Sequence, residues 1–267
     1  MKKFIEEYGI IIVVICLILL MLAFSSGGLS HKVTNSIIST TEQMDAISRK
    51  RPKGTPVEMV SGMDTYSVLS MTEAEKIVFT DDAAPSTVEV TDLSAKGDKS
   101  IVGWAEGTTY KISTQDYGKS VQFSADSSYM FMNCTAKEID FDNIDTSAVT
   151  NMTAMFYGCS NLERLDLSNF DTSSVTNMSN MFQACTSLNK ITLNNWNTSK
   201  VTNMNYTFYY LKNLETLDLS SFDLTSLESN TQMFFKCNKL KKVNIKKQEY
   251  KAQFEKGEDG TSINFAC

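Results

Sequence analysis

The sequence has little of the chemistry that most enzymes use. Its 267 residues include a single histidine, His31, which lies beside a long apolar run near the N-terminus. Serine–histidine–aspartate and cysteine–histidine catalysis, and metal sites built on histidine, are therefore excluded from the rest of the chain. No G-x-x-x-x-G-K-[ST] and no G-x-G-x-x-G motif occurs. We predict no enzymatic activity and no cofactor; a carboxylate-only hydrolase is the one catalytic class that the composition leaves open.

Basic charge, proline and glycine are also scarce. The net charge is −6, so the chain has no basic surface for nucleic acid, which we exclude as a partner. Only three prolines and 12 glycines are present, which argues against a disordered chain. With 42% hydrophobic residues, the chain is long enough to bury the core of one or two domains.

The dominant feature of the sequence is a repeat of about 26 residues that covers residues 127–245. The stretch 151–185 begins and ends with N-M-x-x-M-F-x-x-C and encloses L-x-x-L-D-L-S-x-F-D-T-S-x-V. The aromatic residue of this pattern recurs in register as Phe131, Phe156, Phe182, Phe208 and Phe234. A period of this length indicates a solenoid, in which each repeat buries its apolar face by stacking on its neighbours.

Within each repeat, the pattern predicts a strand, a capped turn and a short helix. In L-D-L, at 165–167, the leucines point to one side and the aspartate to the other, as period-two alternation requires. The F-D-T-S segment is typical of a turn whose Asp, Ser and Thr side chains bind nearby backbone N–H groups. The apolar residues of V-x-x-M-x-x-M-F-x-x-C fall at i, i+3, i+6, i+7 and i+10, which predicts a helix of about two to three turns.

The segment L-D-L-S-N-F-D-T-S-S-V-T-N-M-S-N-M-F-Q-A-C, at 165–185, resembles the 26-residue repeat of BspA-like bacterial surface proteins. The resemblance covers about residues 130–245 and rests on positions that recur in register. It implies a relative of leucine-rich repeats with an extracellular, adhesive role. We therefore expect the α/β fold class, as a short leucine-rich-repeat-like solenoid with a β-rich N-terminal cap and an N-terminal transmembrane helix.

Four of the six cysteines share one position of the repeat. They are Cys134, Cys159, Cys185 and Cys237, and Leu211 occupies this position in the remaining copy. A residue that exchanges with leucine is most simply a small buried hydrophobe, so we predict buried free thiols. Disulfides between neighbouring repeats are the alternative. Zinc is disfavoured because no C-x-x-C pair exists, and we predict no metal site.

Two rows of side chains form the candidate partner surface. The outward strand position holds Asp140, Asp166, Thr192, Asp218 and Asn244. An aromatic row in the turns consists of Phe170, Trp196 and Phe222. The acidic row is either a surface for calcium or a cationic partner, or a solvated face, and it lacks the dense spacing of a calcium loop. The aromatic row is either stacked core or, where half-exposed, part of the partner surface.

Residues 1–30 are predicted to be a membrane anchor or a signal segment. Residues 10–24 are an unbroken apolar run, and no charge occurs in the 23 residues from Tyr8 to Ser30. At about 1.5 Å per residue, residues 8–30 extend roughly 34 Å, enough to cross a bilayer core of about 30 Å. The alternative is a signal peptide that is cleaved after Ser25, which small residues at 23 and 25 suit, but Glu6 and Glu7 do not fit the positive N-terminal region of such a peptide. Both alternatives predict that the repeats are exported.

Three further segments complete the predicted organisation. Residues 31–54 are a stalk whose basic cluster at 49–53 is either a solvated spacer or a patch for lipid headgroups, and this cluster is the main argument against export. Residues 55–126 alternate like short strands and are predicted to be a β-rich N-terminal cap, or a separate ligand-binding domain. Residues 246–267 are charged and are predicted to be a polar C-terminal cap or a tail.

Together these features predict a cell-surface binding or adhesion module. It would display the repeats for contact with an extracellular protein or glycan, held in the cell membrane by an N-terminal anchor or secreted after cleavage. The alternative is a structural membrane protein whose repeats scaffold a membrane complex.

Overall fold

The computed structural model describes residues 56–70, 72–254 and 263–267. The predicted anchor or signal segment at 1–30 and the predicted stalk at 31–54 lie outside these residues. The described residues belong to one compact unit, Lys53–Cys267. In this part of the chain no helix has the length and apolar character needed to cross a membrane.

The N-terminal part of this unit is built from short strands and one helix. The strands are β1 (Val57–Glu58), β2 (Lys76–Thr80), β3 (Thr91–Asp92), β4 (Val102–Glu106), β5 (Thr109–Ser113) and β6 (Val121–Gln122). The helix α3 (Gly62–Leu69) begins after Ser61, whose hydroxyl accepts the N–H of Asp64 as an N-cap. A Cβ on Gly62 would lie 2.2 Å from the carbonyl oxygen of Ser128, so only glycine allows α3 to approach the first repeat this closely.

The repeats follow from residue 126. We define repeat 1 as residues 126–150, repeat 2 as 151–176, repeat 3 as 177–202, repeat 4 as 203–228 and repeat 5 as 229–245. Their strands are β7 (Glu138–Asp140) and β8 (Ile144–Asp145) in repeat 1, then β9 (Arg164–Asp166), β10 (Lys190–Thr192), β11 (Thr216–Leu219) and β12 (Lys242–Ile245). The C-terminal residues form the 3₁₀-helix η1 (Gln248–Tyr250), α4 (Lys251–Phe254) and β13 (Asn264–Ala266).

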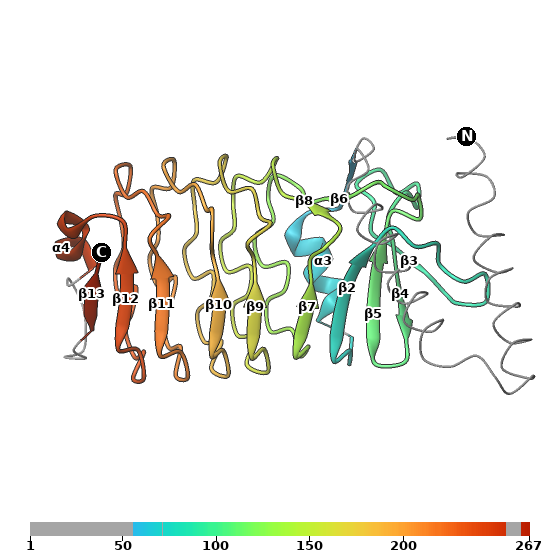
Figure 1. Cartoon of the computed structure of the whole chain (residues 1–267). Coiled ribbons are helices and arrows are strands. Elements are labelled where there is room, and N and C mark those ends of the chain that lie inside the picture. The colour runs from blue at the N-terminus through green and yellow to red at the C-terminus, as the bar shows by residue number, and fades with distance from the viewer. Residues whose placement is uncertain (1–55, 71, 255–262) are drawn as a thin grey trace, which may run out of the picture. The chain divides into compact units, whose positions relative to one another are not determined.

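The strands of the described residues form four sheets. Their orders are β1-β6-β8, β3-β4-β5-β2-β7, β10-β9 and β11-β12-β13. The pairs β9–β10, β11–β12 and β12–β13 are parallel and in register, so that Leu165 lies opposite Ile191, and Leu217 opposite Val243. Figure 1 shows β7, β9, β10, β11 and β12 side by side, and we call these five strands the strand row.

A second set of segments joins the repeats away from the strand row. It comprises residues 126–134, 151–159, 177–185, 203–211 and 229–237, which we call the turn row. In repeats 1 to 4, every second N–H of the turn row donates to a carbonyl of the next repeat. In repeat 2 these bonds run from Met152 to Asn177, from Ala154 to Ser179, from Phe156 to Met181 and from Gly158 to Gln183. The intervening N–H groups close turns within the repeat, as Met155 does to Met152 and Tyr157 to Ala154.

The prediction of a short helix in each repeat is therefore wrong. The backbone angle φ is positive at every fourth residue of the turn row, as at Ala154 (53°) and Gly158 (71°). An α-helix requires φ near −63° at every residue, so the turn row cannot be helical. Successive four-residue turns return Met152 and Phe156 to the buried side, and this period of four resembles the 3.6-residue period of a helix.

The predicted fold class is corrected accordingly. The described residues are mostly short β-strands and turns, with α3 of eight residues and α4 of four as their α-helices. Residues 126–245 contain no α-helix. The structure therefore does not contain, in its described part, the predicted α/β leucine-rich-repeat-like solenoid or an N-terminal transmembrane helix. The period-two alternation of the strands, in contrast, is confirmed by the burial of Leu165 and Leu217 beside the exposed Asp166 and Asp218.

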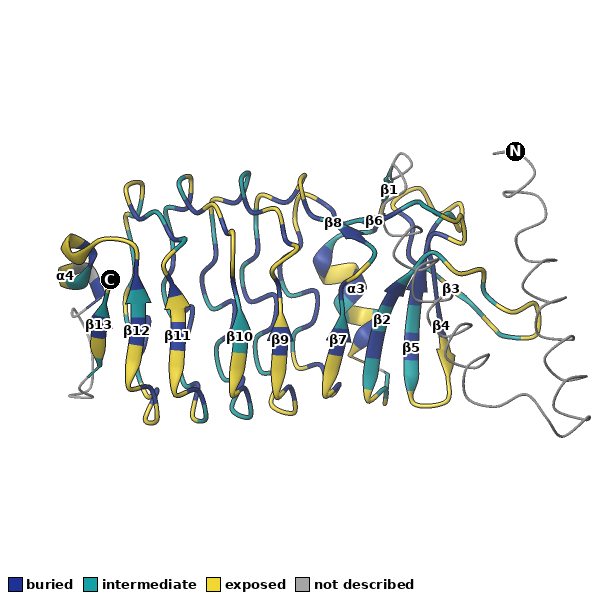
Figure 2. Ribbon diagram, in the orientation of Figure 1, coloured by how far each residue is buried: buried dark blue, intermediate teal, exposed yellow. Residues whose placement is uncertain are grey.

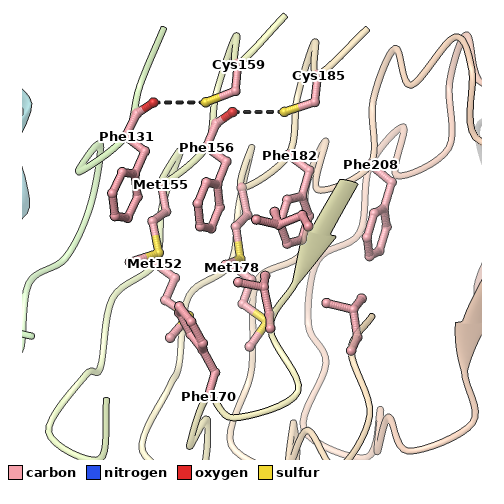
Figure 3. Close-up of a cluster of buried hydrophobic side chains, with 14 of the residues drawn as sticks. Phe131, Met152, Met155, Phe156, Cys159, Phe170, Met178, Phe182, Cys185 and Phe208 are labelled. Atoms are coloured by element: carbon pink, nitrogen blue, oxygen red, sulfur yellow. Dashed lines mark hydrogen bonds between the residues drawn. The ribbon is translucent and has the colours of Figure 1, made fainter. Parts of the chain in front are cut away.

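A column of phenylalanine rings forms the centre of the core. The rings are those of Phe131, Phe156, Phe182, Phe208 and Phe234, with successive centroids 5.1, 5.7, 5.5 and 5.7 Å apart and nearly parallel planes. Figure 3 shows the first four of these rings beside the buried methionines of the turn row. Figure 2 shows the buried residues on the inner side of the repeats and the exposed ones mainly at the strand ends and loops.

Buried threonines join the turns that follow the strands. Thr146, Thr172 and Thr198 donate their hydroxyls to the carbonyls of residues 171, 197 and 223, and they accept the N–H groups of the same residues. The residue before each threonine, Asp145, Asp171 or Asn197, caps its own turn, as Asp171 does by accepting the N–H of Ser173 at 2.9 Å. The capping role predicted for the F-D-T-S segment is thus confirmed.

The C-terminal residues extend the sheet and cover the last repeat. β13 pairs in parallel with β12, and the rings of Phe254 and Phe265 stack on each other beside Phe234. Lys246 forms an ion pair with Asp223 at 2.9 Å. The predicted polar cap or tail therefore also contributes buried aromatic side chains.

Candidate functional site

The outward positions of the strand row place the predicted acidic row along one face. Asp140, Asp166, Thr192, Asp218 and Asn244 end or lie within β7, β9, β10, β11 and β12, each next to an inward apolar residue. Thr192 lies opposite Asp166, and Asp218 opposite Asn244. Asp166 and Asp218 are exposed, while Asp140, Thr192 and Asn244 are half-buried. These side chains are therefore available to solvent along the strand row.

A groove of about 590 Å³ opens on this face between β7 and β9. β7 pairs with β2 and β9 pairs with β10, and no strand pairing joins β7 to β9 in the described part of the chain. Repeat 1 is one residue shorter than repeats 2, 3 and 4, and the missing residue falls between Cys134 and Ile139, just before the end of β7. Two of the predicted site residues, Asp140 and Asp166, line this groove.

Carboxylates dominate the groove. Its acidic residues are Glu138, Asp140, Asp142, Glu163 and Asp166, and its basic ones are Lys137 and Arg164. Two of these charged residues form ion pairs with residues outside the groove: Glu138 with Lys76 at 2.6 Å, and Lys137 with Glu75 at 2.9 Å. Arg164 is exposed and takes part in no ion pair within the described residues. The groove thus offers one guanidinium fork among several carboxylates.

The aspartates at the ends of β7 and β9 also accept hydrogen bonds from the turns that follow these strands. Asp140 accepts the N–H of Asp142 at 3.0 Å, and Asp166 accepts the N–H of Ser168 at 3.0 Å. Each carboxylate keeps one oxygen for a second partner, because these bonds use only Oδ1. The aspartates are therefore fixed in direction by the fold while they remain able to accept hydrogen bonds from a ligand.

A second hollow, of about 360 Å³, lies where β10 and β11 are also unpaired. Asp218 lines it together with Asn194, Asn195, Ser220 and Ser221. Burial raises the pKa of Asp218, but hydrogen bonds from Ser220 and Asn244 outweigh burial, and the pKa lies below its usual value. Asp218 is therefore a carboxylate at neutral pH, and this hollow is polar and acidic.

The structure places the aromatic row inside the core. Phe170, Trp196 and Phe222 are 3%, 2% and 1% exposed. The indole N–H of Trp196 donates to the carbonyl of Leu167 at 2.9 Å, and its ring stacks on Phe222 at 5.9 Å. In this conformation the three rings contact neighbouring repeats and present no surface to a partner.

The thiols of the turn-row cysteines are buried and are not accessible as nucleophiles. Cys134, Cys159, Cys185 and Cys237 are buried free thiols, as the sequence predicted. Three of them donate to a phenylalanine carbonyl of the preceding repeat, at 2.9, 3.0 and 2.8 Å for Cys159, Cys185 and Cys237. Burial raises the pKa of Cys134 to about 12 and also raises that of Cys159. Because the thiolate is the reactive form, these groups serve packing.

Sequence reasoning missed Arg164 and Glu163, which complete the groove. Arg164 lies two residues before Asp166 on the same outward face, so strand alternation could have identified it. No signal in a single repeat could have identified the groove, because it depends on which strands pair. Among the described residues, no group of three or more His, Cys, Asp or Glu side chains could hold a metal ion.

In a comparison with known proteins, part of the chain matches a protein family whose function is unknown. Residues 125–248 match the family described as "Mycoplasma protein of unknown function, DUF285". No curated protein and no solved structure matches the chain. The match covers the repeats and leaves the resemblance to BspA-like proteins as a prediction.

Proposed function

We propose that this chain is a non-catalytic binding module of the cell surface. Its strand row would contact an extracellular protein or glycan, with the groove between β7 and β9 as the centre of the contact. The observation that supports this proposal most directly is Arg164, an exposed guanidinium without an ion-pair partner in the described residues, set among carboxylates that the fold holds in place.

The groove has the features of a recognition surface. Arg is enriched at the centres of interfaces because its planar fork binds carboxylates and carbonyls with two hydrogen bonds. The surrounding carboxylates accept hydrogen bonds from hydroxyl, amide or cationic groups, and they would repel partners with the wrong charge pattern. Mixed charge of this kind suits a polar partner, which a protein surface or a hydroxyl-rich glycan provides.

Surface location is the second part of the proposal, and it rests on the sequence. The apolar run at 10–24 within residues 1–30 suits either an anchor in the cell membrane or a signal segment that is cleaved. Protease treatment of intact cells that produce the chain tests this part, with an antibody against the repeats. We expect the repeats to be cleaved from whole cells; repeats that stay protected until lysis would contradict the proposal.

The binding part is tested with the full chain on cells and immobilised extracellular proteins and glycans. The variant Arg164→Glu should reduce attachment by roughly tenfold or more, because it replaces the donor fork with a sixth carboxylate. Lys96→Glu is the matched control, since it makes the same change of charge at an exposed position between β3 and β4, away from the strand row and the groove. Equal attachment of both variants and the unmodified chain would contradict the role of the groove. A stable partner that co-purifies from the same membrane would favour a scaffold of a membrane complex instead.

A further inference from the structure

The turn row carries a cluster of aromatic and basic side chains in repeats 4 and 5. Its members are Tyr206, Tyr209, Tyr210, Lys212, Phe235 and Lys236, which we call the Tyr–Lys patch. The rings of Tyr206 and Tyr209 meet edge to face at 5.7 Å, and Tyr209 stacks on Phe235 at 5.5 Å. The four aromatic side chains are half-buried and the two lysines are exposed. All its members belong to the turn row except Lys212, which directly follows the turn row of repeat 4, and none of them lines the groove of the strand row.

The patch differs from repeat 3, although single tyrosines occur at two of its positions elsewhere, as Tyr129 in repeat 1 and Tyr157 in repeat 2. At the positions of Tyr206, Tyr209, Tyr210 and Lys212, repeat 3 has Asn180, Gln183, Ala184 and Thr186. The backbone is the same in both repeats, because φ is 58° at both Tyr206 and Asn180, and 64° at Tyr210 against 61° at Ala184. Asparagine accepts this left-handed conformation readily, whereas a bulky tyrosine rarely adopts it. The fold therefore does not require tyrosine at these positions, and Tyr206 and Tyr210 occupy left-handed positions that the turn row imposes on every repeat.

The patch presents hydroxyl and ammonium groups. The Lys212 ammonium lies 4.5 Å from the centroid of the Tyr210 ring, and the Lys236 ammonium lies 5.7 Å from the same centroid. A hydrogen bond from Lys212 and the charge of its ammonium lower the pKa of the Tyr210 phenol. The tyrosine hydroxyl and the two ammonium groups thus converge as hydrogen-bond donors on one small area. Such an area attracts a carboxylate.

We propose that the Tyr–Lys patch is a docking site for an acidic segment of another protein. Lys212 and Lys236 would pair with Asp or Glu side chains of that segment, and Tyr206 and Tyr209 would contact its backbone and apolar groups. Tyrosine is among the residues that contribute most to protein interfaces, since it combines a large rigid ring with a hydroxyl. The charge of the patch is opposite to that of the chain as a whole, which is −6, so an acidic partner would bind here and be repelled elsewhere.

A protein partner suits the patch better than an acidic glycan does. Sugars bind aromatic side chains by stacking on a free ring face. Here one face of Tyr209 is covered by Phe235, and the Tyr210 ring has two ammonium groups over it. The ring edges and hydroxyl groups that remain are better matched to peptide carbonyls and carboxylates. The proposal is independent of the strand-row groove, because it uses none of its residues.

The probe for this site is poly-L-glutamate, with polygalacturonate of the same charge as the carboxylated glycan, each titrated into the full chain. We expect poly-L-glutamate to bind more tightly and to lose affinity as salt is raised. The double variant Lys212→Glu/Lys236→Glu should weaken this binding by about tenfold or more. Lys190→Glu/Lys242→Glu is the control, because it changes the net charge equally at exposed strand-row positions. The control should bind within about twofold of the unmodified chain.

A second variant separates the tyrosines from the charge. In Tyr206→Asn/Tyr209→Gln/Tyr210→Ala, repeat 4 receives the residues that repeat 3 already carries on the same backbone, so the chain should fold normally. We expect this variant to bind poly-L-glutamate at least about fivefold more weakly while its melting temperature is maintained. The proposal is overturned if either patch variant binds as the unmodified chain does, if polygalacturonate binds more tightly with the same dependence on the patch, or if poly-L-glutamate does not bind. Arg164→Glu should leave this binding undiminished, so failure of the groove and failure of the patch are distinguishable.

Discussion

The strand row and the turn row use the same repeat in opposite ways. In the turn row, backbone hydrogen bonds join every repeat to the next, from Ser127 and Asn151 to Tyr210 and Phe235. In the strand row, pairing is interrupted between β7 and β9 and again between β10 and β11, and both hollows lie at these interruptions. The continuous row therefore holds the repeats together, and the interrupted row leaves polar groups available for recognition.

The largest effect should come from a charge in the inner face of the turn row. Phe182→Asp would bury an unpaired carboxylate between Phe156 and Phe208, at a position that is 0% exposed. We expect a loss of several kcal/mol and cooperative unfolding of the repeats, measured by thermal or urea denaturation. Ser168→Asp, at an exposed position of repeat 2, is the control and should change the midpoint little. A folded Phe182→Asp chain would show that the phenylalanine column is not the core.

The next largest loss of stability should distinguish a threonine-to-valine substitution at a buried turn position from the same substitution on the strand row. Thr172→Val removes a hydroxyl that donates to the carbonyl of Asn197 and accepts its N–H, at a position that is 1% exposed. We expect a loss of about 1–3 kcal/mol, because both backbone groups lose their partner. Thr192→Val has the same shape change on the outward side of β10 and should change stability by less than about 0.5 kcal/mol. Equal losses in denaturant titrations would remove the distinction between the two positions.

The contrast between the rows also explains what the sequence could predict. Strand alternation is a local property, so L-D-L at 165–167 sufficed to place Leu165 inward and Asp166 outward. The turn row imitates a helix because its turns recur every four residues, and only the φ values of residues such as Ala154 reveal the difference. The cysteine position was predicted correctly because Leu211 showed that packing, and not chemistry, is required there.

The candidate site was less predictable than the core. The groove exists because β7 pairs with β2 while β9 pairs with β10, and the first of these pairings joins segments 62 residues apart. A pattern within one repeat contains no information on such a choice. The Tyr–Lys patch could have been found by asking where a repeat departs from its neighbours, since Tyr206 and Tyr210 replace asparagine and alanine. The buried state of Trp196 required knowledge of how the turns pack on each other.

Acid should weaken the end of the stack of repeats, where Asp223 joins the last turn to the C-terminal residues. Hydrogen bonds from Lys246 and Thr225 hold the pKa of Asp223 well below its usual value. A carboxyl group with a lowered pKa in the folded state adds stability above its unfolded pKa, near 4, and this stability is lost as the pH falls through the folded pKa. Asp223→Asn should therefore cost about 1 kcal/mol at pH 7, and the difference from the unmodified chain should shrink below about pH 4.

Urea titrations at several pH values measure this difference. Glu163→Gln provides the control, because Glu163 is exposed and forms no ion pair in the described residues. Its stability should follow that of the unmodified chain at every pH. A difference for Asp223→Asn that stays constant from pH 7 to pH 2 would mean that the ion pair with Lys246 does not contribute to folding.

The smallest effect is expected on the outward strand row itself. Asp166→Asn keeps an oxygen that can accept the N–H of Ser168, so the turn remains capped, and the exposed side chain has no other partner among the described residues. Stability should change by less than about 0.5 kcal/mol. If it falls by more than about 1 kcal/mol, the acidic row contributes to holding the repeats together and the division between the rows fails. If stability is unchanged, the carboxylate is dispensable for folding, and any loss of attachment in the same variant can be assigned to recognition at the groove.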